Sequence, residues 1–506
     1  MRIAILVVSL LGPALLGLAL PGLAVPAAAQ APGCTVTPGG PETVIDAIVL
    51  TDGPAPGYGR VVVGADGRIA CVGAACRAAG PSPRRIACPG YVLSPGLINP
   101  HDHIDFTGIA PLPDRGERFV HRHEWRKGLD GHTELKDAVP DHDPELIAWG
   151  ELRMLLSGVT AMVGEDMAPG LVRNLDFATG LDGVPMRPVT YQIFPLDDAP
   201  GIMRTRDCDY GHHPSGPDDV AASQAFLAHV AEGTGDAARN EFRCLSTGLY
   251  DTTPQPGGGG TSQDLMQPHM TILHGVGLRP DDLAVLRRRG VRLVWSPRSN
   301  LALYGRTLDV LAARRLGIPV ALGTDWLPSG SMNMSREFAC ALRYDDQSLH
   351  GALDMRDLWR MATMGGALAT HADAWLGSIA PGKLADLVLF HPGADPFAAV
   401  VRATPAGVAL VLRGGHVLYG DAALTAGLAL PDCEPLTVGG VAKALCIRRD
   451  QPFSYAMLRA DMGRRHVYPL ATDGPPPNEP PCETLAETSA RLPDAPLTAG
   501  RSGSRP

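Results

Sequence analysis

The sequence predicts an α/β chain: a parallel (β/α)8 barrel with a small β domain formed by the N- and C-terminal flanks. From about residue 145 to 326, apolar strands alternate with amphipathic helices, which is typical of parallel β/α units. Residues 43–93 and the residues after 376 lack this helical pattern and are typical of strands. A doubly wound open sheet is the competing architecture for the alternating region.

The first residues predict a secretory signal peptide. The stretch MRIAILVVSLLGPALLGLAL has one basic residue and then an apolar run, and Ala27, Ala28 and Ala29 supply a small-residue cleavage signal. An uncleaved membrane anchor is the alternative. No other segment is long and apolar enough to span a bilayer, so we expect an exported protein, periplasmic or extracellular, without a stable span after cleavage.

Ten cysteines agree with export, because disulfides persist in oxidising compartments. No CxxC pair occurs, so the sequence does not predict a structural zinc site. We expect local bridges between Cys433 and Cys446 and between Cys208 and Cys244.

The composition is that of an ordinary globular protein, with 45% hydrophobic and 19% charged residues. The formal net charge of -9 argues against a nucleic-acid partner, which would favour a basic face, so a small-molecule substrate is expected instead. Exposed faces of barrel helices commonly associate, so the sequence leaves a homo-oligomer open.

The predicted units follow one another along the chain. They are the signal peptide 1–29, the first part of the β domain 30–94, the barrel 95–375, the second part of the β domain 376–425, and a C-terminal extension 426–506 that is rich in proline and glycine and partly disordered.

Within the alternating region, the strands and helices can be assigned in order. Strands are expected at VTAMVG, RPVTYQIFPL, AFLAHVAEG, MTILHGVGL, VRLVWSPRSN and IPVALGTDW, and helices at ELIAWGELRMLLSG, GDAARNEFRCL, RPDDLAVLRRRG and TLDVLAARRLG. Only about thirty residues separate RPVTYQIFPL from HVAEG, which is short for another full unit. Either a further strand lies in 165–186 or the barrel is irregular.

Polar residues stand at the ends of these apolar strands. SPGLINPHDH ends in His101 and His103, and residues i and i+2 of a strand face the same side. HVAEG adds His229 and Glu232, while ILHGVGL and LGTDW add a further histidine and a carboxylate. Each histidine alone is more often a core residue. Together, in order at strand ends, they predict a metal site with imidazole and carboxylate ligands, the set that zinc favours.

These motifs also carry a family resemblance. The ordered pattern PGLIN-P-HDH, HVAEG, LHGVGL, SPRSNLALYG, LGTDW and GSIAPGKLADLVLF, over roughly residues 43–425, resembles the amidohydrolase superfamily. The chain is most similar to the branch that holds cytosine and guanine deaminases, triazine chlorohydrolases and imidazolonepropionases. The resemblance implies a distorted barrel with a small β-sandwich made from both flanks.

The resemblance also implies a site. One divalent metal ion, zinc first with iron or manganese as alternatives, would be bound by four residues: His101, His103, His229 and Asp325. Asp325 would also accept the proton of a metal-bound water, Glu232 would pass it to the leaving nitrogen, and His274 would hold the water or polarise the attacked carbonyl. Ser299 and Asn300 would shape the pocket, or else cap backbone groups in a turn.

The lysines argue for a single metal ion. Binuclear members of the superfamily use a carbamylated lysine from a barrel strand. None of the four lysines here ends a recognisable central strand; they are Lys127, Lys136, Lys383 and Lys443.

The segment 107–143 is an insertion after the first barrel strand and contains HRHEWRKG. We interpret it as a lid from which Trp125 or Arg126 touches substrate, with a solvated surface loop as the alternative. Residues 327–336 form the second expected specificity loop.

The sequence therefore predicts an exported metal-dependent enzyme that hydrolyses a carbon–nitrogen bond, other than a peptide bond, in a cyclic amide or amino-heterocycle. A secreted metallopeptidase or N-acyl amino acid hydrolase is the enzyme alternative. A catalytically inactive binding protein on the same scaffold is the alternative from another class.

Overall fold

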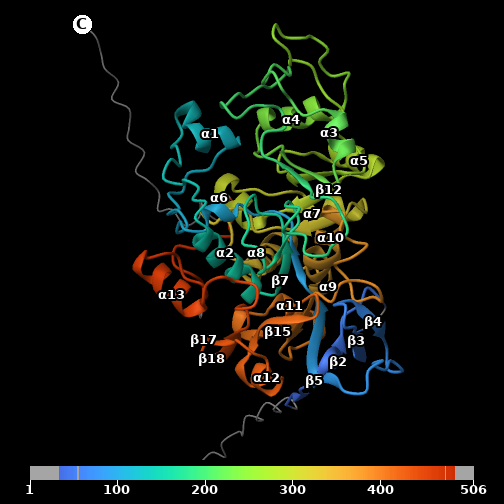
Figure 1. Ribbon diagram of the computed structural model, residues 1–506. Coiled ribbons are helices and arrows are strands. Elements are labelled where there is room, and N and C mark those ends of the chain that lie inside the picture. Colours follow the sequence, from blue (N-terminus) through green and yellow to red (C-terminus); the bar gives the residue numbers. More distant parts are fainter. Residues whose placement is uncertain (1–32, 54–55, 473, 485–506) are drawn as a thin grey trace, which may run out of the picture.

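The computed structural model describes residues 33–53, 56–472 and 474–484. A layer of parallel strands and surrounding helices occupies the centre of the molecule, and a large sheet from both flanks lies at one end (Figure 1). The predicted signal peptide and the end of the predicted C-terminal extension lie outside the described residues. Among the described residues, no helix has the length and apolar character needed to cross a membrane.

Eight short parallel strands form the central layer, in two sheets. The first sheet has the order β6-β7-β8, and the second has the order β13-β12-β11-β10-β9. Their bounds are β6 Leu97–Asn99, β7 Val159–Met162, β8 Arg173–Asn174, β9 Thr190–Gln192, β10 Phe226–Val230, β11 Met270–His274, β12 Arg292–Trp295 and β13 Val320–Leu322. All pairs within these sheets are parallel, which confirms the predicted α/β class.

Single backbone hydrogen bonds cross the two gaps between these sheets. The Val189 N–H donates to the Leu175 carbonyl at 2.9 Å, and the Asp325 N–H donates to the His101 carbonyl at 2.9 Å. Among the described strands, no ladder closes the two sheets into a continuous barrel. The strand β8 lies in the region 165–186, where one of the two alternatives drawn from the spacing expected a further strand.

Helices follow or surround these strands. Their bounds are α1 Arg122–Lys127, α2 Pro144–Leu156, α3 Pro217–Ala222, α4 Asp236–Ser246, α5 Pro280–Arg289, α6 Pro297–Tyr304, α7 Val310–Arg315, α8 Met334–Tyr344, α9 Met355–Arg360, α10 Gly366–Ala369, α11 Pro396–Val401, α12 Ala422–Gly427 and α13 Tyr455–Arg464. Buried apolar side chains of the helices and strands form a large core, and a second cluster lies among the central strands.

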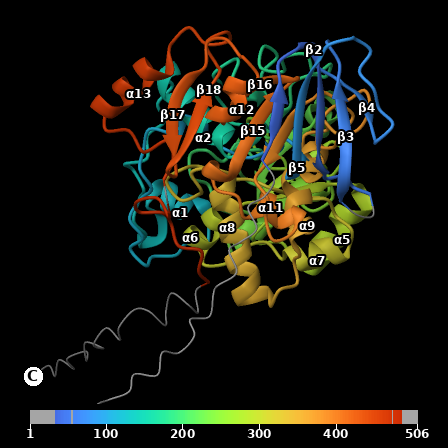
Figure 2. The ribbon, with the colours of Figure 1, turned by 90° about the horizontal axis from the view of Figure 1, so that it is seen from below.

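The two flanks meet in a single ten-stranded sheet (Figure 2). Its strands are β1 Thr35–Thr37, β2 Gly40–Val49, β3 Gly57–Val63, β4 Ile69–Val72, β5 Pro83–Pro95, β14 Leu387–Phe390, β15 Val408–Arg413, β16 His416–Asp421, β17 Glu434–Val438 and β18 Val441–Leu445. The β domain expected from both flanks is thus present. Two of its strands, β17 and β18, come from the predicted C-terminal extension.

The strand β5 joins this sheet to the site. It pairs with β2 in parallel and with β14 in antiparallel orientation, and the chain then runs through Gly96 into β6. A Cβ atom on Gly96 would lie 2.0 Å from the Thr160 Oγ1 atom, so only glycine fits this close approach.

Five disulfides link all the cysteines, including both predicted bridges. The pairs are Cys34–Cys88, Cys71–Cys76, Cys208–Cys244, Cys340–Cys482 and Cys433–Cys446.

Candidate metal centre and substrate pocket

The first two histidines follow β6 rather than lying within it. The strand ends at Asn99, and Pro100, which has no N–H to donate to a strand ladder, comes next. The prediction that the histidines belong to the strand is therefore wrong. His101 and His103 nevertheless share a site, while the Asp102 carboxylate turns away to accept a hydrogen bond from the Asn99 side chain at 3.1 Å.

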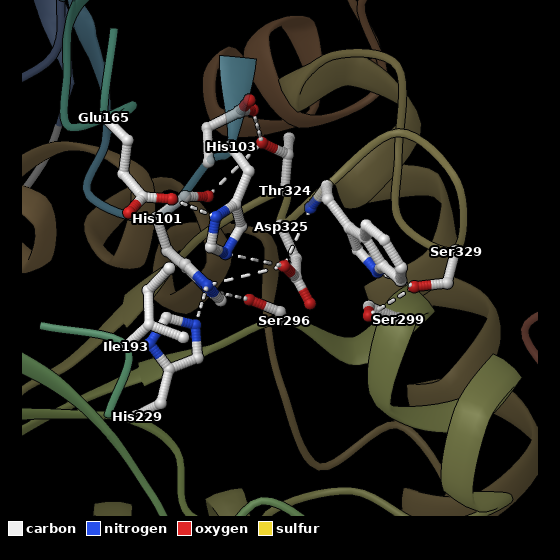
Figure 3. A network of polar contacts seen from close by, with 12 residues as sticks. His101, His103, Glu165, Ile193, His229, Ser296, Ser299, Thr324, Asp325 and Ser329 are labelled. Atoms are coloured by element: carbon white, nitrogen blue, oxygen red, sulfur yellow. Dashed lines mark hydrogen bonds and ion pairs between the residues drawn. The ribbon is translucent and has the colours of Figure 1, made fainter. Parts of the chain in front are cut away.

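Four side-chain donor atoms converge at the carboxyl ends of the strands (Figure 3). The His101 Nε2 atom lies 3.3 Å from the His229 Nε2 atom and 3.4 Å from the Asp325 Oδ1 atom. The His103 Nε2 atom lies 3.6 Å from the same Asp325 oxygen. Ligands about 2.1 Å from a tetrahedral metal ion lie roughly 3.4 Å from one another, so these separations fit a small divalent cation.

The outer nitrogen of each histidine in the cluster is also engaged. The His101 Nδ1 atom lies 2.9 Å from the Ser296 hydroxyl, and the His103 Nδ1 atom contacts the Glu165 carboxylate. The His229 Nδ1 atom lies 3.5 Å from the Gln192 carbonyl. Such partners fix the orientation of a metal-binding imidazole and leave its inner nitrogen free to coordinate.

Burial prepares two of these rings as ligands. Desolvation, together with the neighbouring histidines, holds the pKa of both His101 and His229 well below the usual range. Both rings are therefore neutral near pH 7, and a neutral imidazole is the form that binds a metal ion.

Two further groups face the same point. The His274 Nε2 atom lies 3.9 Å from the Asp325 Oδ2 atom and 3.7 Å from the Glu232 Oε2 atom. The Asn300 side-chain oxygen lies 2.9 Å from the His274 Nδ1 atom and orients the ring. The Tyr304 hydroxyl donates to the Glu232 Oε1 atom at 2.7 Å. The six predicted metal-binding and proton-transfer residues are thus brought together.

The backbone is unusual at this cluster. Four residues other than glycine have a positive φ next to or within it: Glu165 at 64°, Ala231 at 57°, His274 at 67° and Asp325 at 57°. This left-handed conformation costs about 1–3 kcal/mol for such residues and is concentrated at functional sites. Here it accompanies the turn of the chain at the strand ends, where the side chains leave the sheet.

A cavity of about 420 Å³ opens onto the cluster. Its lining includes the polar residues His103, His229, Glu232, His274 and Asp325 and the aromatic residues Phe106, Trp125, Phe194 and Trp326. The rings of Trp125 and Trp326 lie 4.9 Å apart. The cavity therefore combines flat apolar walls with a few convergent polar groups, as small-molecule sites do.

The insertion 107–143 contributes part of this wall. Trp125 and Arg126, which the sequence predicted as substrate contacts, both line the cavity. The preceding residues His121, Arg122 and His123 are buried, so the alternative of a solvated loop is wrong for α1. Lys136 also lines the cavity, whereas the sequence gave it no role there.

Two residues of the SPRSN motif were predicted to shape the pocket, and neither reaches the cavity. Ser299 and Asn300 are buried in α6, and neither belongs to the residues that line the cavity. The Ser299 hydroxyl lies 2.8 Å from the Ser329 hydroxyl, and Asn300 contacts His274 instead of capping a turn.

Two lysines lie away from the cluster. The Lys443 ammonium donates to the Asp421 carboxylate at 2.5 Å, and the Lys383 ammonium donates to backbone carbonyls, one of them that of Leu376 at 3.0 Å. None of the four lysines lies in one of the eight central strands.

Parallel strands whose carboxyl ends gather histidines and carboxylates define an α/β protein with a candidate metal centre. The amidohydrolase family profile matches residues 223–418. A 5-methylthioadenosine/S-adenosylhomocysteine deaminase of Nitratidesulfovibrio vulgaris (strain DSM 19637 / Miyazaki F) is 28% identical over 71% of this chain and 88% of its own length. A 5'-deoxyadenosine deaminase of Methanothermobacter thermautotrophicus is 33% identical over 32% of this chain and 40% of its own.

Solved structures share the fold. A zinc-bound adenosine deaminase from Xanthomonas campestris matches with a TM-score of 0.52 and 21% identity over 84% of this chain and 97% of its own. Atrazine chlorohydrolase from Arthrobacter aurescens, also with zinc, gives a TM-score of 0.55 and 17% identity over 84% and 99% of the two chains. The family profile and the sequence relatives therefore confirm the predicted resemblance to the amidohydrolase superfamily.

Proposed function

We propose that this protein is an exported, zinc-dependent hydrolase that removes an amino group from a planar amino-heterocycle, on a distorted (β/α)8 barrel. The observation that carries the proposal is the convergence of His101, His103, His229 and Asp325 at one point, with Glu232 and His274 beside them. The aromatic walls of the cavity suit a flat ring above this point.

The cation would be held by His101, His103, His229 and one oxygen of Asp325. When bound, it would act as a Lewis acid and lower the pKa of a water molecule toward neutrality. None of the four lysines lies in one of the eight central strands, which favours a single ion. Zinc is favoured because its usual ligands are nitrogen and carboxylate oxygen in a tetrahedral arrangement.

The two oxygens of Asp325 have different surroundings. The Oδ1 atom faces His101 and His103, and the Oδ2 atom lies 3.9 Å from the His274 Nε2 atom. Asp325 Oδ2 is therefore placed to accept a proton from the attacking water. The Glu232 Oε2 atom, 3.7 Å from the same His274 nitrogen, is placed to deliver a proton to the leaving amino group.

The comparisons support the chemical class. The sequence relatives reported above are deaminases of adenosine derivatives, and both the adenosine deaminase and the atrazine chlorohydrolase structures hold zinc. An amino-substituted purine or a related amino-substituted ring is therefore the first substrate class to test.

Export is supported by a separate observation. All ten cysteines are paired in five disulfides, which is rare in a reducing cytosol. This agrees with the signal peptide that the first residues predict.

The proposal is tested by elemental analysis of the purified mature protein, followed by a screen for ammonia release from amino-purines, amino-pyrimidines and amino-triazines. We expect about one zinc ion per chain and its loss in the variant His101→Ala. We also expect Asp325→Asn to abolish ammonia release while the circular dichroism spectrum is retained. A metal-loaded protein that releases no ammonia from any ring, or an active Asp325→Asn variant, would refute the assignment.

A further inference from the structure

Arg126 has an unusual position in the wall of the cavity. It lies near the end of α1, and its guanidinium stands 4.2 Å from the centre of the Phe194 ring. It lines the same cavity as Glu232 and His274, the two groups placed for proton transfer. A cation fixed at this place faces any molecule bound above the metal centre.

A buried chain of hydrogen bonds orients Arg126. Its Nη1 atom lies 2.7 Å from the His123 Nδ1 atom, and the His123 Nε2 atom lies 2.8 Å from the Asp198 carboxylate. Arginine can only donate, so the His123 Nδ1 atom accepts and its ring proton is on Nε2, toward Asp198. Burial lowers the pKa of His123, which agrees with a neutral ring.

The Asp198 carboxylate at the end of this chain is already paired with another arginine. The Arg122 guanidinium donates to the Asp198 carboxylate at 2.6 Å and lies 3.3 Å from the Glu241 carboxylate. Arg126 is held by a neutral imidazole, and among the described residues no carboxylate forms an ion pair with it. Its charge is therefore only partly compensated.

The direction of the Arg126 pKa shift agrees with a charge that is only partly compensated. Burial lowers the pKa of Arg126, and the neighbouring Arg122 lowers it further, while Asp198 and Glu232 offset only part of the effect. A partly buried cation whose charge is only partly compensated is stabilised most by an anionic group that enters the cavity. Arg122 and Lys136 also line this cavity, together with the exposed Glu134.

We propose that the substrate carries an anionic group, a carboxylate or a phosphate, on its planar amino-heterocycle, and that Arg126 binds this group. The inference rests on the proposed function and names the substrate class within it. The aromatic side chains of the cavity hold the ring of the substrate. The forked guanidinium of Arg126 binds the anionic group at the other end of the substrate.

The test compares two ligands that differ in one charge. Purine riboside has no amino group to lose, and its 5′-carboxylate and 5′-carboxamide forms have nearly the same shape. Calorimetry with the zinc-loaded protein measures the Kd of each. We expect the wild type to bind the carboxylate at least about tenfold more tightly, because a hydrogen bond to a charged group is worth that much. Arg126→Gln should abolish the preference, and Arg126→Lys should retain part of it.

The matched control is Arg402→Gln, an exposed arginine directly after α11 and outside the lining of this cavity, which should bind both ligands as the wild type does. Equal Kd values for the pair, equal weakening of both ligands in Arg126→Gln, or no binding of either ligand by the wild type would overturn the inference.

Ammonia release from the corresponding adenosine 5′-carboxylate and 5′-carboxamide separates the two proposals. Release from both without preference would overturn the anionic substrate class and leave the deaminase assignment standing. No release from any amino-heterocycle would count against the assignment, and the Kd comparison would still decide whether Arg126 recognises an anion.

Discussion

At the scale of single residues, the hydrogen bonds of Glu232 determine which of its oxygens faces the cavity. The Trp125 indole can only donate, and it does so to the Tyr304 hydroxyl at 2.9 Å. The hydroxyl must therefore give its own hydrogen to the Glu232 Oε1 atom, 2.7 Å away. The Oε2 atom is left facing His274, which is the arrangement that a proton carrier needs.

The variant Tyr304→Phe tests this positioning. Removing the hydroxyl frees the Glu232 carboxylate to rotate, and a hydrogen bond to a charged group contributes about 1.5–3 kcal/mol. We expect kcat for ammonia release to fall at least about tenfold while KM changes little, because the lost contact acts on the proton carrier and not on the ring. Steady-state kinetics with the best substrate of the screen measures both constants.

Its control is Tyr58→Phe, which removes the hydroxyl of an exposed tyrosine in β3 and should leave kcat unchanged. If Tyr304→Phe keeps the wild-type kcat, Glu232 does not depend on this hydrogen bond.

The same residues show what the sequence could predict about the site. His229, His274 and Asp325 were predictable because each follows an apolar run that ends at a strand terminus. Glu165 and Tyr304 were not, because their partners are 62 and 72 residues away and no local pattern marks them. Tyr304 stands in the quoted SPRSNLALYG motif, yet only the folded structure places its hydroxyl on Glu232.

At the scale of elements, α2 carries a buried acid with an unusual environment. Burial raises the pKa of Glu151 to about 8, although hydrogen bonds from the Ala168 and Val172 backbone and the Asn174 side chain act to lower it. The ordinary value is 4.5. Because the folded state holds this proton more tightly than the unfolded state, Glu151 contributes most below the unfolded pKa.

Glu151 should therefore make stability depend on pH. Its contribution is complete below about pH 4.5, falls as the pH rises, and is lost above about pH 8. The slope between these values is at most about 1.4 kcal/mol per pH unit. Glu151→Gln cannot titrate, so urea unfolding at pH 5, 6.5 and 8 should show a flatter dependence for the variant than for the wild type.

Glu134→Gln, at an exposed position in the insertion, provides the comparison for this experiment. Identical slopes for wild type and Glu151→Gln would mean that the Glu151 carboxyl does not change its proton occupancy on folding.

The strands and helices also differ in how well the sequence predicted them. The strands β10 and β11 and the helices α4 and α5 were predictable, because each has a clear apolar period over at least five residues. Two elements gave no such signal. β8 has two residues, and α1 has six, most of them polar. Arg122 and His123 of α1 are buried because they pair with Asp198 and Glu241, which lie in distant parts of the chain.

At the scale of the whole molecule, the C-terminal segment is held against α6 and α8. Arg298 of α6 donates to the Pro480 carbonyl at 2.5 Å, and Arg336 of α8 forms an ion pair with Glu479 at 2.5 Å. The disulfide between Cys340 and Cys482 fixes the same segment to α8. The sequence did not predict this arrangement, because neither the bridge nor the ion pairs leave a local pattern.

This disulfide should contribute far more to stability than the shortest one. Cys340 and Cys482 are 142 residues apart, whereas Cys71 and Cys76 are 5 apart. In the chain-entropy account, closing the long loop restricts the unfolded chain by about 5 kcal/mol and closing the short loop by about 2 kcal/mol. We therefore expect Cys340→Ser/Cys482→Ser to lower the free energy of unfolding by about 3 kcal/mol more than Cys71→Ser/Cys76→Ser does. Urea unfolding of both variants and the wild type, without reductant, measures the difference, and equal losses would contradict a stabilisation that grows with loop length.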